Sequence, residues 1–208
     1  MSEIVGLTLR VATISTLFVA PLATILAALT WRAHSKIRTI LDAAALLPLV
    51  LPPTAVGFVL LQFLPRDVLF SATAVVIACA VMSFPLMYLA ARAAIDSSDV
   101  RYFDIARTLG ASPLRAFSTI TLPLAWRGLL AGTILAFCRA IGEFGATIIV
   151  AGNIPGRTQT LALAIYDRIN LGHDDEARLL VIYVVLIAAT AIVASELLVR
   201  RQWRRASH

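Results

Sequence analysis

Three stretches of this chain run for more than twenty residues without a charged side chain, and they restrict the possible folds severely. They are Val11–Trp31, Ala43–Pro65 and Val68–Ala91, of 21, 23 and 24 residues. A helix needs about 20 apolar residues to cross the hydrocarbon core of a bilayer. Only 14% of all residues are charged, against about 25% in a soluble domain. A soluble globular fold is therefore excluded, and we expect an all-α integral membrane protein surrounded by membrane lipid.

Two further stretches are apolar but interrupted by charges. Leu124–Gly152 carries charged residues near its start and in its middle, and Leu179–Val199 is uncharged until Glu196. We predict five transmembrane helices in one membrane domain that covers residues 1–208. The predicted spans lie at about 6–30, 41–64, 69–94, 125–151 and 178–199.

The distribution of basic residues predicts the orientation, because Lys and Arg are retained on the cytoplasmic side. The segments 31–40, 92–127 and 200–208 together hold twelve of the 18 basic residues, whereas the alternate loops and the N-terminal end hold five. The N-terminus is therefore expected outside and the C-terminus in the cytoplasm, which requires an odd number of spans. The net charge of +6 follows from this topology, so no nucleic-acid partner is expected.

Motifs for catalysis or metal binding are not apparent in the sequence. The three histidines are scattered over different loops, and Cys79 and Cys138 lie inside apolar stretches. The sequence holds no His-Glu-x-x-His motif and no phosphate-binding loop, so this chain is not expected to hydrolyse ATP itself. An intramembrane enzyme is therefore disfavoured, and we expect no catalytic residue, metal ion or cofactor on this chain.

The long inner segment 95–123 is predicted to form two short helices. Apolar residues recur at helical spacing within Tyr102–Leu109, and residues 97–99 offer N-caps. Gly110 stands where a helix can end in a left-handed residue, and Ser112-Pro113 supplies a cap and a first-turn proline for a second helix. Such a hairpin suits docking by a soluble partner. The alternative is an interfacial helix lying on lipid headgroups.

A spaced motif occupies the same segment. Residues 104–110 read Asp-Ile-Ala-Arg-Thr-Leu-Gly, and after nine further residues 120–123 read Ile-Thr-Leu-Pro. This pattern resembles the EAA loop of ABC importer permeases, which reads Glu-Ala-Ala, three residues, Gly, nine residues, then Ile-x-Leu-Pro. The resemblance implies docking into a groove on a separate ATP-binding subunit. The residues that it assigns to ATPase coupling are Asp104, Ala106, Arg107, Gly110, Ile120, Leu122 and Pro123.

Four other segments narrow the resemblance. They read Leu-Pro-Leu-Val-Leu-Pro-Pro at 47–53, Met-Ser-Phe-Pro-Leu at 82–86, Gly-Glu-Phe-Gly-Ala-Thr at 142–147 and Asn-Ile-Pro-Gly-Arg-Thr-Gln-Thr at 153–160. These segments resemble the molybdate permease family, and the similarity extends over nearly the whole chain. Sulfate permeases share a segment like 142–145, so a sulfate-type oxyanion permease is the alternative.

The resemblance implies a type I importer fold of the molybdate and methionine kind, in a bacterial or archaeal cytoplasmic (inner) membrane. It also implies a homodimer of the permease and two copies of an ATP-binding subunit that hold ATP and Mg²⁺. An extracytoplasmic molybdate-binding protein would deliver molybdate or tungstate.

Prolines and glycines mark a candidate translocation pathway. Each of Pro48, Pro52 and Pro53 removes a backbone donor, so the second span must kink or break. Freed carbonyls within a membrane are tolerated only against protein or a water-filled cavity. We therefore expect this helix to line the pathway; the alternative is a kink packed inside the bundle with no role in transport. Gly142 and Gly145 would permit close helix approach across a subunit interface.

Arg139 and Glu143 stand four residues apart, where side chains on one helix face can pair. Arg139 would offer a passing dianion a positive potential that Glu143 moderates. The alternative is a structural ion pair, and an ion-coupled carrier using Glu143 as a proton site is a further possibility. The pathway and gate candidates are Pro48, Pro52, Pro53, Gly57, Arg139, Gly142, Glu143, Gly145 and Thr147.

Overall fold

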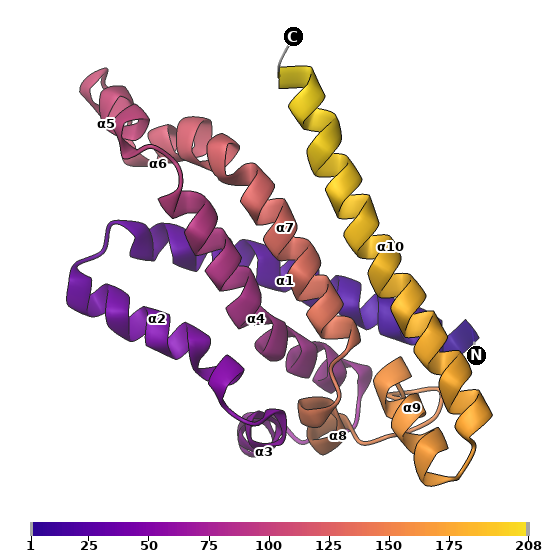
Figure 1. Ribbon diagram of the computed structural model, residues 1–208. Coiled ribbons are helices and arrows are strands. Elements are labelled where there is room, and N and C mark those ends of the chain that lie inside the picture. Colours follow the sequence, from indigo (N-terminus) through magenta and orange to yellow (C-terminus); the bar gives the residue numbers. More distant parts are fainter. Residues whose placement is uncertain (1, 207–208) are drawn as a thin grey trace.

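The computed structural model of the protein describes residues 2–206, and it describes side chains up to residue 193. Every regular element in that part is helical (Figure 1), as the sequence predicts. The elements in chain order are α1 (Ser2–Trp31), α2 (Ser35–Val50), α3 (Pro53–Phe63), α4 (Ala72–Asp96), α5 (Val100–Thr108), α6 (Pro113–Ala116), the π-helical turn η1 (Phe117–Thr121), α7 (Leu122–Ile141), α8 (Gly145–Ala151), α9 (Leu161–Asn170) and α10 (Asp174–Ala206).

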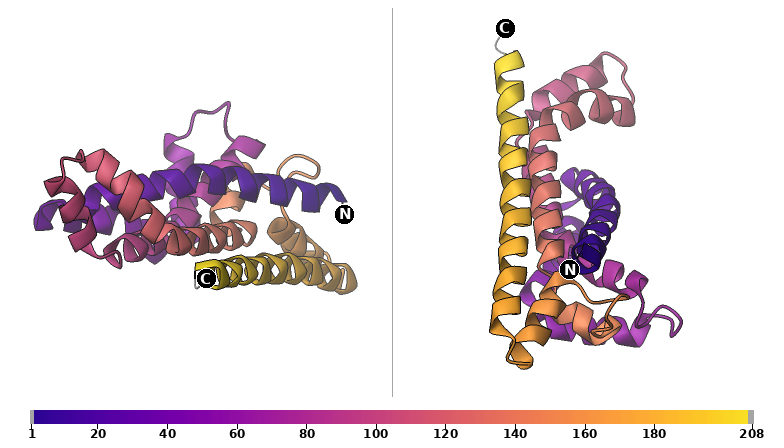
Figure 2. Two further views of the ribbon diagram at one scale, coloured as in Figure 1. Left: turned by 90° about the horizontal axis from the view of Figure 1, so that it is seen from above. Right: turned by 90° about the vertical axis from the view of Figure 1, so that its right-hand side faces the viewer.

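Within the described residues, four helices are long and apolar enough to cross a membrane. They are α1, α4, the continuous helix through α6, η1 and α7, and α10. A fifth span results if the bent pair α2 and α3 counts as one. In Figures 1 and 2, α4, α7 and α10 run roughly alongside one another, and α1 crosses them at an angle.

The second span is broken at its proline pair. α2 and α3 meet at 111°, with Pro52 as the N-cap and Pro53 in the first turn of α3. Proline suits a first helical turn because its missing N–H would have no partner there, whereas it disrupts a helix interior. The predicted kink or break is confirmed, but the continuous helix expected over 41–64 is replaced by two helices.

The fourth span differs from the prediction at both ends. α7 stops at Ile141, three residues follow without helical structure, and α8 resumes the chain, so the helix expected over 125–151 is interrupted. At its inner end the helix starts at Pro113, because α6 continues through η1 into α7. The wide turn of η1 ends just before Pro123, whose ring would clash with the carbonyl four residues earlier in a regular α-helix.

Small residues pack the central helices. α4 contacts both α1 and α7 extensively. A Cβ added at Gly128 would lie 2.5 Å from the Cβ of Ala94, and one added at Gly132 would lie 2.6 Å from that of Ala90. Backbones approach this closely in membrane proteins where neither helix carries a large side chain.

Contacts between loops agree with the predicted sidedness. At the inner end, the Trp31 and Phe103 rings lie 5.3 Å apart. At the other end, the backbone N–H of Phe70 donates to the carbonyl of Val150 at 3.0 Å. Each contact therefore joins segments that the count of basic residues assigns to one side of the membrane.

Candidate functional site

α5 is anchored to the end of α1 by one buried aromatic side chain. Phe103 is 5% exposed, and its ring packs edge-on against Trp31. The helix begins at its N-cap Asp99, whose carboxylate accepts a hydrogen bond of 2.9 Å from the backbone N–H of Arg101. That hydrogen bond lowers the pKa of Asp99, because it stabilises the charged carboxylate. The cap predicted among residues 97–99 is therefore Asp99.

The end of α5 has the geometry of a Schellman motif. Gly110 has a φ of +87°, a conformation that side-chain-bearing residues rarely adopt. The N–H of Ala111 donates to the carbonyl of Ala106 at 3.0 Å, and the N–H of Gly110 donates to that of Arg107 at 3.1 Å. The Arg107 side chain donates to the Ala111 carbonyl at 2.6 Å. Three of the predicted coupling residues thus build the turn itself.

The α5–α6 hairpin exposes an apolar face along α5, and Leu114 at the start of α6 is exposed beside α1 side chains such as Leu29. Leu109 is 82% exposed and Leu114 is 77% exposed. The exposed apolar side chains of the α5–α6 hairpin are Val100, Tyr102, Ile105, Leu109 and Leu114. Contiguous exposed apolar residues on a projecting element are typical of a surface that binds a partner.

Asp104 does not belong to this apolar face. Its carboxylate lies 2.8 Å from Nη2 of Arg32, and the Arg32 guanidinium stacks 4.7 Å from the centre of the Phe103 ring. Both charged side chains are about half exposed. Asp104 therefore helps to hold α5 against α1, a contact that the motif did not predict.

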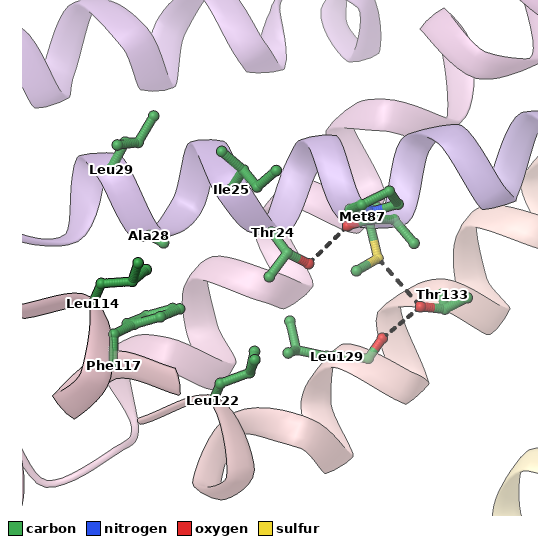
Figure 3. Close-up of a pocket in the computed structure, with 12 residues that line it drawn as sticks. Thr24, Ile25, Ala28, Leu29, Met87, Leu114, Phe117, Leu122, Leu129 and Thr133 are labelled. Carbon is green, nitrogen blue, oxygen red and sulfur yellow. Dashed lines mark hydrogen bonds between the residues drawn. The ribbon is translucent and has the colours of Figure 1, made fainter. Parts of the chain in front are cut away.

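The second half of the motif lies on the helix that enters the membrane. Ile120 belongs to η1, and Leu122 and Pro123 begin α7. Leu122 lines an apolar cavity of about 540 Å³ between α1 and the α6–α7 helix. Figure 3 shows Phe117 and Leu122 on one side of this cavity, with the α1 side chains on the other. The second short helix of the predicted hairpin is therefore not a separate element, because α6 is the start of the membrane span that continues through α7.

Two threonine hydroxyls that line this cavity donate to their own helices, and that of Thr133 also donates to Sδ of Met87 on α4 at 3.8 Å. Thr24 donates to the carbonyl of Ala20 at 2.7 Å, and Thr133 donates to that of Leu129 at 2.8 Å (Figure 3). No charged residue lines the cavity among the residues that the structure describes. An anion would find no partner here, so the cavity is not a candidate for the pathway.

The predicted pathway residues on α3 and α8 come together. A Cβ added at Gly57 would lie 2.8 Å from the Cα of Ala146, and one added at Gly145 would lie 2.7 Å from the Cβ of Pro53. The two short helices therefore touch through their backbones. Pro52 and Pro53 are exposed, and Pro48 is half-buried beside α1 and α4.

Gly142 and Gly145 differ in their surroundings. The close approach expected across a subunit interface occurs at Gly145 inside one chain, against α3. The nearest atom to a Cβ added at Gly142 is 3.9 Å away, in its own helix. Within one chain a neighbouring helix approaches Gly145 and not Gly142, and the approach across a subunit interface stays a prediction for both.

Arg139 and Glu143 form the predicted ion pair. Glu143 is 1% exposed, and its Oε2 lies 2.7 Å from Nη1 of Arg139. Its Oε1 accepts a hydrogen bond of 2.8 Å from the backbone N–H of Ala146. Thr147, in the same turn of α8, is fully buried. One carboxylate thus connects the end of α7 to the start of α8 across the break.

The structure also gathers five polar residues that the sequence analysis did not single out. Asp42 accepts a hydrogen bond from Tyr88 and pairs with Arg92, and Arg38 lies 2.9 Å from Asp96. The sequence does contain a pattern that indicates ion pairing, because α2 and α4 each carry an Arg and an Asp four residues apart. Nothing in the sequence alone showed that these two helix ends face each other.

A family model described as "binding-protein-dependent transport system inner membrane component" matches residues 20–208. The chain is 41% identical to the molybdenum transport system permease protein ModB of Escherichia coli (strain K12), over 98% of this chain and 96% of that protein. It is 40% identical to the putative molybdenum transport system permease protein YvgM of Bacillus subtilis (strain 168), over 88% of this chain and 87% of that protein.

Solved structures share the fold at low sequence identity. The MetNI methionine ABC transporter, in an inward-facing conformation, superposes with a TM-score of 0.81 at 16% identity, over 97% of this chain and 95% of that chain. A bacterial ABC transporter involved in the import of the acidic polysaccharide alginate gives a TM-score of 0.74 at 17% identity, over 96% of this chain and 78% of that chain. The fold is therefore that of an ABC importer permease, as the resemblance implied.

Proposed function

Because this chain belongs to the family of binding-protein-dependent transport system inner membrane components, we propose that it is the permease subunit of an ABC importer for molybdate or tungstate. The observation that carries the proposal is the match of nearly the whole chain to permeases named for molybdenum transport. The described helices supply four or five membrane spans.

ATP is hydrolysed on a separate subunit, and the α5–α6 hairpin connects the permease to it. The exposed apolar face of the hairpin supports this role, because Ile105 and Leu109 otherwise face water at the inner end. The left-handed Gly110 keeps the turn tight, and Phe103 fixes α5 to α1, so force on the hairpin reaches the membrane helices. ATP and Mg²⁺ bind on the partner, and this chain binds no cofactor.

Two copies of the chain form the pathway, with two ATP-binding subunits beneath them and a molybdate-binding protein on the outer side. One copy supplies too few spans to enclose a pore, and its broken span exposes large apolar side chains. Val50 and Phe63 are each 82% exposed, which suits a face that a second copy covers. The proline break and the α3–α8 contact then lie near the pathway.

Arg139 and Glu143 stabilise the break between α7 and α8 in this proposal. The double role of the Glu143 carboxylate supports the structural interpretation, since one oxygen binds Arg139 and the other the N–H of Ala146. Arg139 is 26% exposed, so its guanidinium also reaches the surface, where it adds a positive potential for a dianion.

Uptake of radiolabelled molybdate tests the substrate. Cells that lack their own molybdate permease, but keep its binding protein and ATP-binding subunit, receive this chain or an empty vector. We expect uptake only with the chain, inhibited by excess tungstate and unaffected by excess sulfate. Competition by sulfate would contradict the substrate class and indicate a sulfate-type permease.

A further inference from the structure

Four charged residues form two ion pairs between the ends of α2 and α4 at the inner side of the molecule. Arg38 and Asp42 are one turn apart on α2, and Arg92 and Asp96 are one turn apart on α4. Asp42 pairs with Arg92, and Arg38 Nη2 lies 2.9 Å from Asp96 Oδ2. We call this set the charge ladder. Its signs alternate on both helices, so only one register satisfies all four charges.

The middle of the charge ladder is shielded from water and has further partners. The Arg92 and Asp42 side chains are 19% and 23% exposed. Asp42 also accepts a hydrogen bond from Tyr88, whose hydroxyl lies 3.1 Å from that of Thr30 on α1. Partial burial makes the loss of Asp42 costly, because Arg92 then keeps only its longer contact of 3.5 Å with Asp96, which Arg38 also binds.

α2 has little else to hold it in place. Among its described residues, 35–50, only Ala45 is buried. The helix packs on α4 and more sparsely on α1, and its outer side exposes apolar residues such as Ile40. The charge ladder is therefore a principal specific link between α2 and the rest of the chain.

On α4, the ladder leads directly into the α5–α6 hairpin, which we call the docking hairpin. Asp96 is the last residue of α4, and α5 begins at Val100. The turn between them is held by the Ser97 hydroxyl, which donates to the Ala94 carbonyl at 2.9 Å, and by the buried Ser98, which donates to that of Ile95 at 2.6 Å. A displacement of α5 therefore carries the end of α4 with it.

The α2 side leads to the proposed pathway. α2 ends at the proline break, and α3 beyond it contacts α8 through Gly57 and Gly145. From these connections we infer that the charge ladder transmits movement of the docking hairpin to the broken helix that lines the pathway, with Asp42 and Arg92 as positioning residues. This inference rests on the proposed function, and it adds the connection between the ATP-driven movement and the pathway.

The test compares transport with ATP hydrolysis in the same proteoliposomes, which contain the permease, its ATP-binding subunit and the binding protein. Asp42→Asn removes the charge at the centre of the ladder and leaves the docking face intact. We expect molybdate carried per ATP hydrolysed to fall about tenfold, within the range of typical coupling free energies. Asp42→Glu keeps the carboxylate and should stay within about twofold of the wild type.

Lys36→Gln is the matched control, because it removes an exposed charge from the same helix outside the ladder. A purely structural role for Asp42 would lower transport and ATP hydrolysis in parallel and leave their ratio unchanged, which would overturn the inference. If Asp42→Asn does not assemble, Arg38→Gln breaks the ladder at its more exposed pair, with Asp96. An unchanged ratio of transport to ATP hydrolysis in Arg38→Gln would then overturn the inference.

A second measurement does not depend on the substrate. Spin labels at the exposed positions Ile40 on α2 and Leu89 on α4 report the distance between the helices, with Cys79 and Cys138 replaced. We expect a narrow distance distribution with and without ATP in the wild type, and a broad one in Asp42→Asn. An equally narrow distribution in the variant would refute the link, whereas a wild type that carries no molybdate would refute only the proposed function.

Discussion

At the scale of single residues, the two glycines at the α3–α8 contact have the most specific surroundings. A Cβ at Gly57 would meet the backbone of Ala146, which cannot rotate away as a side chain can. A Cβ at Gly142, three residues before Gly145, would make only ordinary contacts of 3.9 Å or more with its own helix, and φ of Gly142 is −87°. The requirement for glycine therefore comes from the partner helix, and the glycine-rich segment 142–145 alone does not reveal which position is packed.

We predict that Gly57→Ala separates α3 from α8 and lowers stability by about 1–3 kcal/mol, the usual cost of overpacking. Gly142→Ala should change stability little. The measurement is thermal unfolding of the purified complex in detergent. Equal stability of the two variants would contradict the close contact of α3 with α8.

Glu143→Ala should destabilise the protein more than Glu143→Gln. The alanine variant leaves Arg139 without a partner and removes the acceptor for the N–H of Ala146, whereas glutamine keeps an acceptor oxygen. Breaking a buried ion pair from one side costs about 3–5 kcal/mol, so we expect poor assembly of the alanine variant. The yield of complex that co-purifies with the ATP-binding subunit measures this. An alanine variant that assembles normally but transports nothing would favour a role in the pathway.

At the scale of elements, the inner hairpin was largely predictable from its turn residues. Asp99, Gly110 and Ser112-Pro113 have the cap and turn roles that their chemistry favours. The continuity of α6 with α7 was not predictable, because Pro123 normally indicates a helix start. η1 resolves that conflict with a wide turn, and Ala116 and Thr121 beside and within it are buried.

Substitutions at Gly110 test the turn of the hairpin. Nothing lies within 4 Å of a Cβ at this position, so only the backbone conformation penalises a side chain. Gly110→Ala should weaken the turn by about 1–2 kcal/mol, and Gly110→Asn should cost less because asparagine tolerates the left-handed region. We expect ATP-dependent uptake to be highest in the wild type, lower in Gly110→Asn and lowest in Gly110→Ala. An asparagine variant that is less active than the alanine variant would contradict the conformational argument.

At the scale of the whole molecule, the charge-free runs predicted the apolar helices, and the breaks within them depended on partners. The α2–α3 break was indicated by three prolines in six residues. The interruption after Ile141 was not, because the three-residue gap is held by Glu143 reaching both Arg139 and Ala146. The pairing in the charge ladder could not be predicted from the sequence for the same reason, since it joins helices that are distant in the chain.

The predicted orientation is tested by labelling single cysteines in intact cells, in a chain without Cys79 and Cys138. Arg157→Cys in the outer loop should react with a membrane-impermeant maleimide, and Thr119→Cys at the inner end should react only after the cells are opened. Both positions are exposed. The reverse pattern would place the docking hairpin outside and contradict the assignment of sides.

In the proposed function, ATP hydrolysis on a separate subunit drives molybdate through this chain. The direct measurement is molybdate accumulation in proteoliposomes that contain the permease, its ATP-binding subunit and the binding protein. We expect accumulation that requires ATP and the ATP-binding subunit and is unaffected when a proton gradient is dissipated. Accumulation driven by a proton gradient without ATP would contradict the proposed function and indicate an ion-coupled carrier.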